Sequence, residues 1–318
     1  MVINLNNMKY VLTSGCSFTK NKRFIPSQLG ENEPIRFSWP ESLQKELGDS
    51  YKVINLGSAT NDNMSIVRIL YYWINKLTKS GIKYEDIIVG IQWSDPHRES
   101  FYFKKEITNE ELKETQHTLS YVKDSDRDGF FFLTGGFAPP EDENIWRHFK
   151  GTEFKQFMNM YSLGVLSNNI INSTLHWLES WSHFQLFCEK NNIETFYTSM
   201  RNIFSKNVFE HNFDSQFLHK IDSVNWMEKN AILEPYIKEL LTNSKFYFYK
   251  TFGGLLDWTR DNIDRYSDIN PYQELENDKK WKDTLSKDRM MYGHPTPKMM
   301  DVFVKEELFP FLIKENIF

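Results

Sequence analysis

Cysteine is scarce in this sequence of 318 residues, which contains only Cys16 and Cys188. The two lie far apart, and neither belongs to a C-x-x-C pair or to a Cys/His pair, so a disulfide framework and a zinc site are not expected. The glycine pairs at 135–136 and 253–254 lack the downstream lysine of a phosphate-binding loop. We therefore expect no metal and no cofactor, and a protein of a reducing compartment.

Long apolar runs and a concentration of positive charge are also missing. No apolar stretch reaches the roughly 18 residues of a membrane span, and the N-terminus lacks the charged and apolar regions of a secretory signal. A cytoplasmic protein with no membrane span is expected. Lys and Arg number 38 against 43 Asp and Glu, giving a net charge of −5, and the basic residues are scattered. Nucleic acid is therefore not an expected partner.

The composition is otherwise that of a folded globular protein, with 40% apolar and 25% charged residues. Aromatic residues make up 16%, and many fall in polar segments, where rings line grooves or interfaces. The chain is long enough for one large domain or two ordinary ones. We favour a single domain over residues 1–318 that carries insertions.

Alternating strand and helix patterns predict an α/β fold. Short apolar or β-branched runs that end at a turn predict strands at 9–14, 51–56, 86–92 and 194–199, with a fifth at 246–249. Helical spacing of apolar residues predicts helices at 64–77 and 158–191 and a last helix at 296–317, which Pro310 bends or interrupts. This order predicts a three-layer α/β/α domain with a flavodoxin-like, mostly parallel, five-stranded sheet.

Two stretches break the alternation and are predicted to be irregular insertions. They cover about residues 99–155 and 201–287, and we expect them to form a cap over the strand ends. In doubly wound sheets ligands bind at the carboxyl ends of the strands. The residues that follow each predicted strand are therefore the candidates for chemistry.

Suggestive residues follow three of the strands, and a histidine precedes the last helix. Ser17 follows the first strand in GCSFT, Gly57 closes the second, Gln92 and Trp93 close the third, and His294 stands in YGHPTP. Each has an ordinary explanation by itself: Ser17 as a helix N-cap, for example, or His294 as a loop residue. Their combination in this order favours a shared site.

The combination resembles the SGNH, or GDSL-type, hydrolases. In that family a Gly-Asp-Ser-like block holds the nucleophile, a later glycine and an asparagine help form the oxyanion hole, and a C-terminal Asp-x-x-His block supplies the base. Ser17 matches the nucleophile, Gly57 the glycine and His294 the base. The resemblance spans most of the chain through short motifs, and it implies an esterase that acts through an acyl-enzyme.

The chemistry is consistent with these residue types. A serine hydroxyl needs an imidazole to accept its proton as it attacks a carbonyl, and Ser17 with His294 supplies such a pair. Backbone N–H groups at Ser17 and Gly57 suit the oxyanion, because they are fixed before charge develops. Gln92 stands where the family has asparagine and carries the same amide on a longer stem, so it is a further candidate donor.

Two other positions depart from the family pattern. Cys16 replaces the aspartate beside the nucleophile, and we interpret it as a buried structural thiol. Met291 occupies the position of the aspartate that orients the base. Asp288, six residues before His294, is one candidate for that role, and a backbone carbonyl is the alternative, which leaves a Ser-His dyad.

The expected substrate is a small-molecule or glycan ester. Trp93, Asp95 and Arg98 in the loop after the third strand are candidate substrate-binding residues, although Asp95 and Arg98 fit a surface ion pair equally well. Two alternatives stay open: a binding module that keeps the scaffold without efficient chemistry, and an acyltransferase that passes the acyl group to an alcohol.

Overall fold

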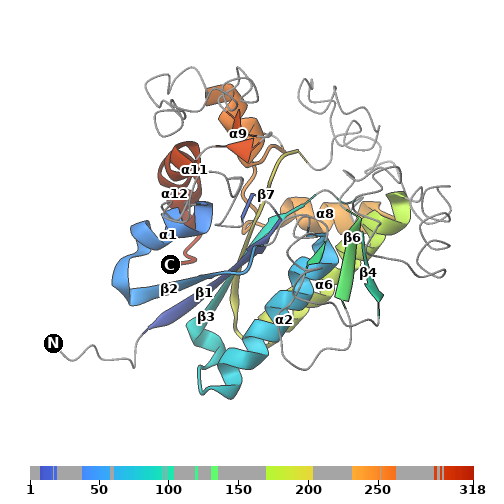
Figure 1. The fold of residues 1–318 in the computed structure, drawn as a ribbon, viewed down its shortest axis with the longest axis horizontal. Coiled ribbons are helices and arrows are strands. Elements are labelled where there is room, and N and C mark those ends of the chain that lie inside the picture. Colours follow the sequence, from blue (N-terminus) through green and yellow to red (C-terminus); the bar gives the residue numbers. More distant parts are fainter. Residues whose placement is uncertain are drawn as a thin grey trace, which may run out of the picture.

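Four parallel strands form the central sheet of the computed structural model (Figure 1). They are β1 (Lys9–Gly15), β2 (Tyr51–Asn55), β3 (Ile87–Trp93) and β7 (Glu194–Ser199), in the order β2-β1-β3-β7. The predicted α/β fold with a parallel sheet is therefore confirmed. The structure describes residues 8–16, 18–19, 38–57, 61–94, 96, 99–103, 119–120, 130–134, 170–202, 231–250, 252–262, 290–291, 294–295 and 297–318.

The fifth strand predicted at 246–249 does not form. Phe246 makes one parallel bridge to Tyr197 beside β7, with the amide of Tyr247 donating to the carbonyl of Tyr197 at 2.8 Å. Pairing stops there because the chain reverses: Lys250 has a positive φ of 53°, and Tyr249 pairs instead with Gly253 in an antiparallel bridge. The described sheet thus has four strands, not five.

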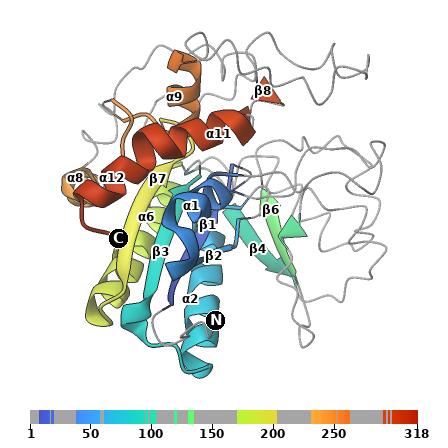
Figure 2. The ribbon, with the colours of Figure 1, turned by 90° about the vertical axis from the view of Figure 1, so that its left-hand side faces the viewer.

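Helices cover both faces of the sheet and complete three layers. One face packs against α2 (Asn63–Lys79), α6 (Ile170–Lys190) and α8 (Glu234–Thr242). The other packs against α1 (Trp39–Leu47), α9 (Leu255–Asn262), α11 (Pro297–Phe303) and α12 (Phe309–Lys314). Because side chains alternate along a strand, Leu12 faces the first layer and Val11 the second. Figure 2 shows α11 and α12 running across the sheet, with α9 above them.

Helix α2 begins at the carboxyl edge of the sheet, and its sequence explains its position. The side chain of Asp62, the N-cap, accepts a hydrogen bond from the amide of Ser65 at 2.7 Å. Ile66, Leu70 and Ile74 follow at helical spacing and are buried against the sheet. The start of α2 is therefore fixed beside the strand ends, as the predicted helix at 64–77 requires.

The last helical segment contains a π-helical turn. Five residues, η6 (Val304–Leu308), join α11 to α12, two residues before Pro310. Proline has no N–H to donate to the carbonyl four residues earlier, so the predicted distortion takes the form of one widened turn. Glu307 on this turn accepts hydrogen bonds from the hydroxyl of Tyr247 at 3.0 Å and from the indole of Trp258 at 3.2 Å. These bonds fix the segment against α9.

Both stretches predicted to be irregular contain regular elements. The first holds an antiparallel sheet of β4 (Glu99–Phe103), β6 (Phe130–Thr134) and β5 (Leu119–Ser120), and β4 contacts α2. The second holds α8 and α9, whose apolar faces join the two cores. Residues 104–118, 121–129 and 135–155 of the first stretch, and 203–230, 251 and 263–287 of the second, lie outside the described part of the chain. Among the described helices, none combines the length and apolar character needed to cross a membrane.

Candidate active site

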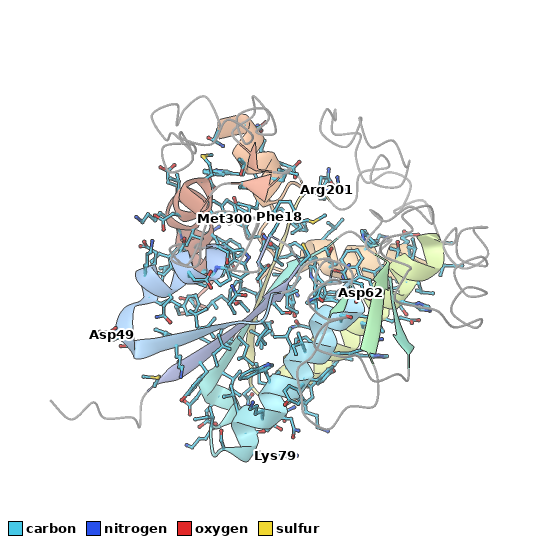
Figure 3. All side chains as sticks on the ribbon, in the orientation of Figure 1. Phe18, Asp49, Asp62, Lys79, Arg201 and Met300 are labelled. Atoms are coloured by element: carbon cyan, nitrogen blue, oxygen red, sulfur yellow. The ribbon has the colours of Figure 1, made fainter. Side chains whose placement is uncertain are left out.

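The predicted site residues divide into described and undescribed positions. Gly57, Gln92 and Trp93 are described, as is the backbone of His294. The rest, Ser17, Asp95, Arg98 and Asp288, lie outside the described residues. The site is therefore built from the residues that surround these positions. Figure 3 shows Phe18, Arg201 and Met300 near the carboxyl end of the sheet.

The chain reverses directly after β1. The amide of Thr19 donates to the carbonyl of Cys16 at 3.1 Å, and both residues are fully buried. A Cβ atom on Gly15 would lie 2.1 Å from Oγ1 of Thr19, far inside van der Waals contact, so no larger residue fits at position 15. The Thr19 side chain thus occupies the space above the end of β1.

Groups from α1 and β2 hold this turn in place. The carbonyl of Thr19 accepts hydrogen bonds from Oγ of Ser38 and from Nδ2 of Asn55, both at 2.7 Å. The carboxylate of Glu41 accepts from Asn55 at 2.9 Å and from the backbone N–H of Ser38 at 2.9 Å, closing the capping box of α1. The buried carbonyl after the predicted nucleophile is therefore fully engaged.

Asn55 also contacts Gly57, the second predicted oxyanion-hole residue. Its Oδ1 accepts a hydrogen bond from the Gly57 amide at 2.9 Å. This N–H group therefore has an acceptor within the protein, and it can reach an oxyanion only by sharing or exchanging that bond. The proposed role of Gly57 stays a prediction. Asn55, for which no role was predicted from the sequence, links the glycine to the turn after β1.

Gln92 is fully buried at the carboxyl end of β3, and its amide is oriented by a chain of donors. The indole Nε1 of Trp39 donates to Oγ1 of Thr19 at 3.1 Å. The Thr19 hydroxyl then donates to Oε1 of Gln92 at 3.0 Å. Nε2 of Gln92 has no hydrogen-bond partner among the described residues. The network thus fixes the carbonyl end of this amide and leaves its donor end unused.

Other unused polar atoms lie along the same edge of the sheet. They are buried and have no partner in the described part of the chain: Asn61 Oδ1, Trp93 Nε1, Ser94 Oγ, Thr198 Oγ1 and Ser199 Oγ. A buried polar group without a partner destabilises the fold, and such groups are rare in proteins except where a ligand or water completes them. Several such atoms lie at the carboxyl edge, which makes this edge the candidate site among the described residues.

Asparagines after β2 tie the strand ends together. Asn61 Nδ2 donates to the carbonyl of Gly15 at 3.3 Å. Asn63 forms two hydrogen bonds with the backbone of Ser94. Its Oδ1 accepts from the Ser94 amide at 2.8 Å, and its Nδ2 donates to the Ser94 carbonyl at 3.1 Å. Neither asparagine was predicted from the sequence to belong to the site. The sequence did contain a signal for them. A helix needs one N-cap residue, which is Asp62, so the asparagines on either side of it were available for another role.

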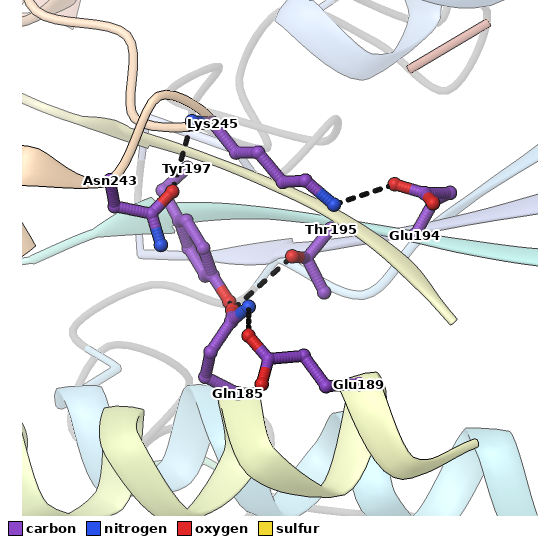
Figure 4. A network of polar contacts seen from close by, with 7 residues as sticks. All are labelled: Gln185, Glu189, Glu194, Thr195, Tyr197, Asn243 and Lys245. Atoms are coloured by element: carbon purple, nitrogen blue, oxygen red, sulfur yellow. Dashed lines mark hydrogen bonds and ion pairs between the residues drawn. The ribbon is translucent and has the colours of Figure 1, made fainter. Parts of the chain in front are cut away.

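The ring of Trp93 belongs to the core. It is fully buried, stacks on Tyr197 at a centroid distance of 6.1 Å and meets Trp177 edge to face at 5.8 Å. Behind it, the Tyr197 hydroxyl and Thr195 both bond to Gln185 of α6 (Figure 4). Burial raises the pKa of Tyr197 far above its ordinary value, so its hydroxyl stays protonated. The indole N–H of Trp93 has no hydrogen-bond partner among the described residues.

The backbone of His294 lies in a short antiparallel pairing rather than in an open loop. β8 (Met290–Met291) pairs with β9 (His294–Pro295), and Met291 is the direct partner of His294. β9 contacts α9 and α11. Helix α9 is bonded to the end of β7 through the amide of Leu256 and the carbonyl of Met200, at 2.8 Å.

A short series of contacts connects β9 to the turn after β1. The sulfur of Met200 lies 3.5 Å from Sγ of Cys16, the residue before Ser17. His294 thus lies on the face of the sheet covered by α9 and α11, which is also the face of Gln92 and Thr19. Two free cysteines occur, Cys16 and Cys188, and both are buried. Among the described residues no three His, Cys, Asp or Glu side chains form a possible metal site.

Comparison with known proteins returns no relative. No protein-family model matches the chain, and neither curated proteins nor solved structures include a significant match.

Proposed function

We propose that this protein is a serine hydrolase of the SGNH type that cleaves an ester, with Ser17 as nucleophile and His294 as base. The observation that carries the proposal is the carboxyl edge of the sheet. There the turn flanking Ser17 is held between α1, β2 and β3, next to the unused donor of Gln92. A neutral donor fixed in a buried setting suits the oxygen of an ester carbonyl.

The reaction follows from these roles. The Ser17 hydroxyl attacks the ester carbonyl carbon and gives its proton to His294. Negative charge moves to the carbonyl oxygen, which accepts a hydrogen bond from Nε2 of Gln92. The intermediate collapses, the alkoxide leaves with the proton from His294, and an acyl group stays on Ser17. Water, deprotonated by His294, then attacks the acyl-enzyme and releases the acid.

A fluorophosphonate probe tests the nucleophile. It forms a phosphorus–oxygen bond to an activated serine and releases fluoride, and we expect digestion and mass spectrometry to place the adduct on Ser17. Ser50, which is exposed, provides the matched control, because Ser50→Ala should label like the wild type. A folded protein that takes up no probe would refute the proposal.

The proposed role of Asp288 is tested by replacing its carboxylate with an uncharged amide. If its carboxylate orients His294, we expect Asp288→Asn to lower kcat for p-nitrophenyl acetate by about a hundredfold or more, with a small change in KM. The matched control is the exposed Asp49→Asn, which should leave kcat unchanged. Unchanged kcat in Asp288→Asn would leave a Ser-His dyad oriented by a backbone carbonyl.

A binding module on the same scaffold is the second candidate. One observation favours it: Met291, at the position of the family's orienting aspartate, is the cross-strand partner of His294, so no carboxylate stands there. Such a protein would bind esters at the same edge and turn them over slowly or not at all. The probe separates the two candidates, because an unactivated serine does not react with it.

A further inference from the structure

Thr198 and Gln92 occupy matching positions on neighbouring strands. They are direct partners in the pairing of β3 with β7, so their side chains project from the same face about 5 Å apart. That face is the one on which Phe196, two residues before Thr198, lies against Gly90, two residues before Gln92. Beyond this contact the sheet presents the two polar side chains side by side.

Both residues are fully buried with an unused polar atom. Neither Nε2 of Gln92 nor Oγ1 of Thr198 has a hydrogen-bond partner among the described residues. One such atom by itself does not identify a ligand. Two on adjacent strands, at the edge where doubly wound sheets bind ligands, point to one group that contacts both.

The chemistry of the pair selects a neutral ligand group. The amide offers N–H donors, and the hydroxyl offers one donor and two lone pairs. Charges of both signs lie at the end of β7: Arg201 adjoins Gly254, and the carboxylate of Asp257 accepts from the amides of Gly254 and Asn202. The two groups that would contact the ligand are both uncharged, so they offer a buried anion or cation no counter-charge. A carbonyl or hydroxyl oxygen fits.

We propose that Thr198 is a substrate-binding residue, which together with Gln92 binds a neutral oxygen of the substrate such as an ester carbonyl. The inference rests on the proposed function for the identity of the substrate. It extends the site to β7, where the resemblance to known hydrolases assigns no residue. Thr198, which is fully buried, then contributes to recognition through its hydroxyl.

The test compares two substitutions on one strand. Thr198→Val keeps the shape of the side chain and removes a hydroxyl that has no partner among the described residues but would contact the substrate. We therefore expect kcat/KM for p-nitrophenyl acetate to fall at least about tenfold, while the urea midpoint of unfolding stays the same or rises. Thr195→Val, on the opposite face, breaks the bond to Gln185 and should lower the midpoint while sparing kcat/KM. Thr198→Ser should retain activity and Thr198→Ala should lose it.

A second measurement separates this inference from the proposed function. In a Ser17→Ala background, which cannot form an acyl-enzyme, ethyl acetate should shift the side-chain amide resonance of Gln92, and Thr198→Val should weaken that shift. A shift without probe labelling of the wild type would retain the binding residue and reject the hydrolase. Labelling together with an unchanged kcat/KM and an unchanged shift in Thr198→Val would overturn the inference and leave the hydrolase standing.

Discussion

Replacing Ser17 with alanine is expected to lower kcat for p-nitrophenyl acetate at least about a thousandfold, while the protein stays folded. The reason is that no other group forms the acyl-enzyme; the residual rate comes from binding and from donors such as Gln92. His294→Ala should reduce kcat by a similar factor, because serine attack then lacks a proton acceptor. Steady-state kinetics with circular dichroism of each variant measures both effects.

Combining the two substitutions sharpens this prediction. Residues that act in one step are strongly non-additive, so the double variant should be scarcely slower than either single variant. His183, exposed on α6, provides the control, since His183→Ala removes an imidazole without approaching the sheet edge. Independent effects that multiply in the double variant would contradict the Ser17–His294 pair.

Replacing Asn55 with alanine is expected to affect both stability and activity. Its side chain donates to the Thr19 carbonyl and to Glu41 and accepts from the Gly57 amide. Removing it leaves partly buried groups unpaired, for a loss of about 3 kcal/mol in the free energy of unfolding. Activity should fall at least about tenfold, because the turns at Ser17 and Gly57 lose their common anchor.

Urea denaturation and kinetics on the same preparation distinguish the two effects. Asn75, exposed on α2, is the matched control, and Asn75→Ala should change neither quantity beyond a few tenths of a kcal/mol. If the free energy of unfolding of Asn55→Ala equals that of the wild type, the hydrogen bonds of the Asn55 side chain do not hold the turn. If stability falls and kcat/KM does not, Asn55 supports the fold alone.

Much of the fold was predictable because its strands have strong local signals. The continuous apolar run of β3 and the β-branched run of β1 each end at a polar turn, and the structure has strands at both. The prediction of a fifth strand was wrong for a local reason. The aromatic residues at 246–249 have high β-propensity, but the turn at Lys250 leaves room for only one bridge.

The location of the candidate site at the strand ends stays a prediction, and its supporting contacts could not be predicted from the sequence. Gln92 follows from its place at a strand end, whereas the roles of Thr19 and Asn55 depend on contacts across 36 to 73 residues of sequence. No periodic pattern encodes such contacts. The role of Thr198 could not be predicted either. Its position beside Gln92 depends on the register between β7 and β3, which the alternation of side chains along β7 does not give.

The turn after β1 has a consequence for the order of folding. Its anchors are Ser38, Asn55 and Gln92, which lie 19, 36 and 73 residues further along the chain than Thr19. Closing such loops costs entropy that the contacts of the assembled sheet offset, so we expect the turn to become ordered after β3 has joined β1. Ser17, the proposed nucleophile, is therefore expected to emerge early during synthesis and to acquire its setting late, once the strands that hold the turn are in place.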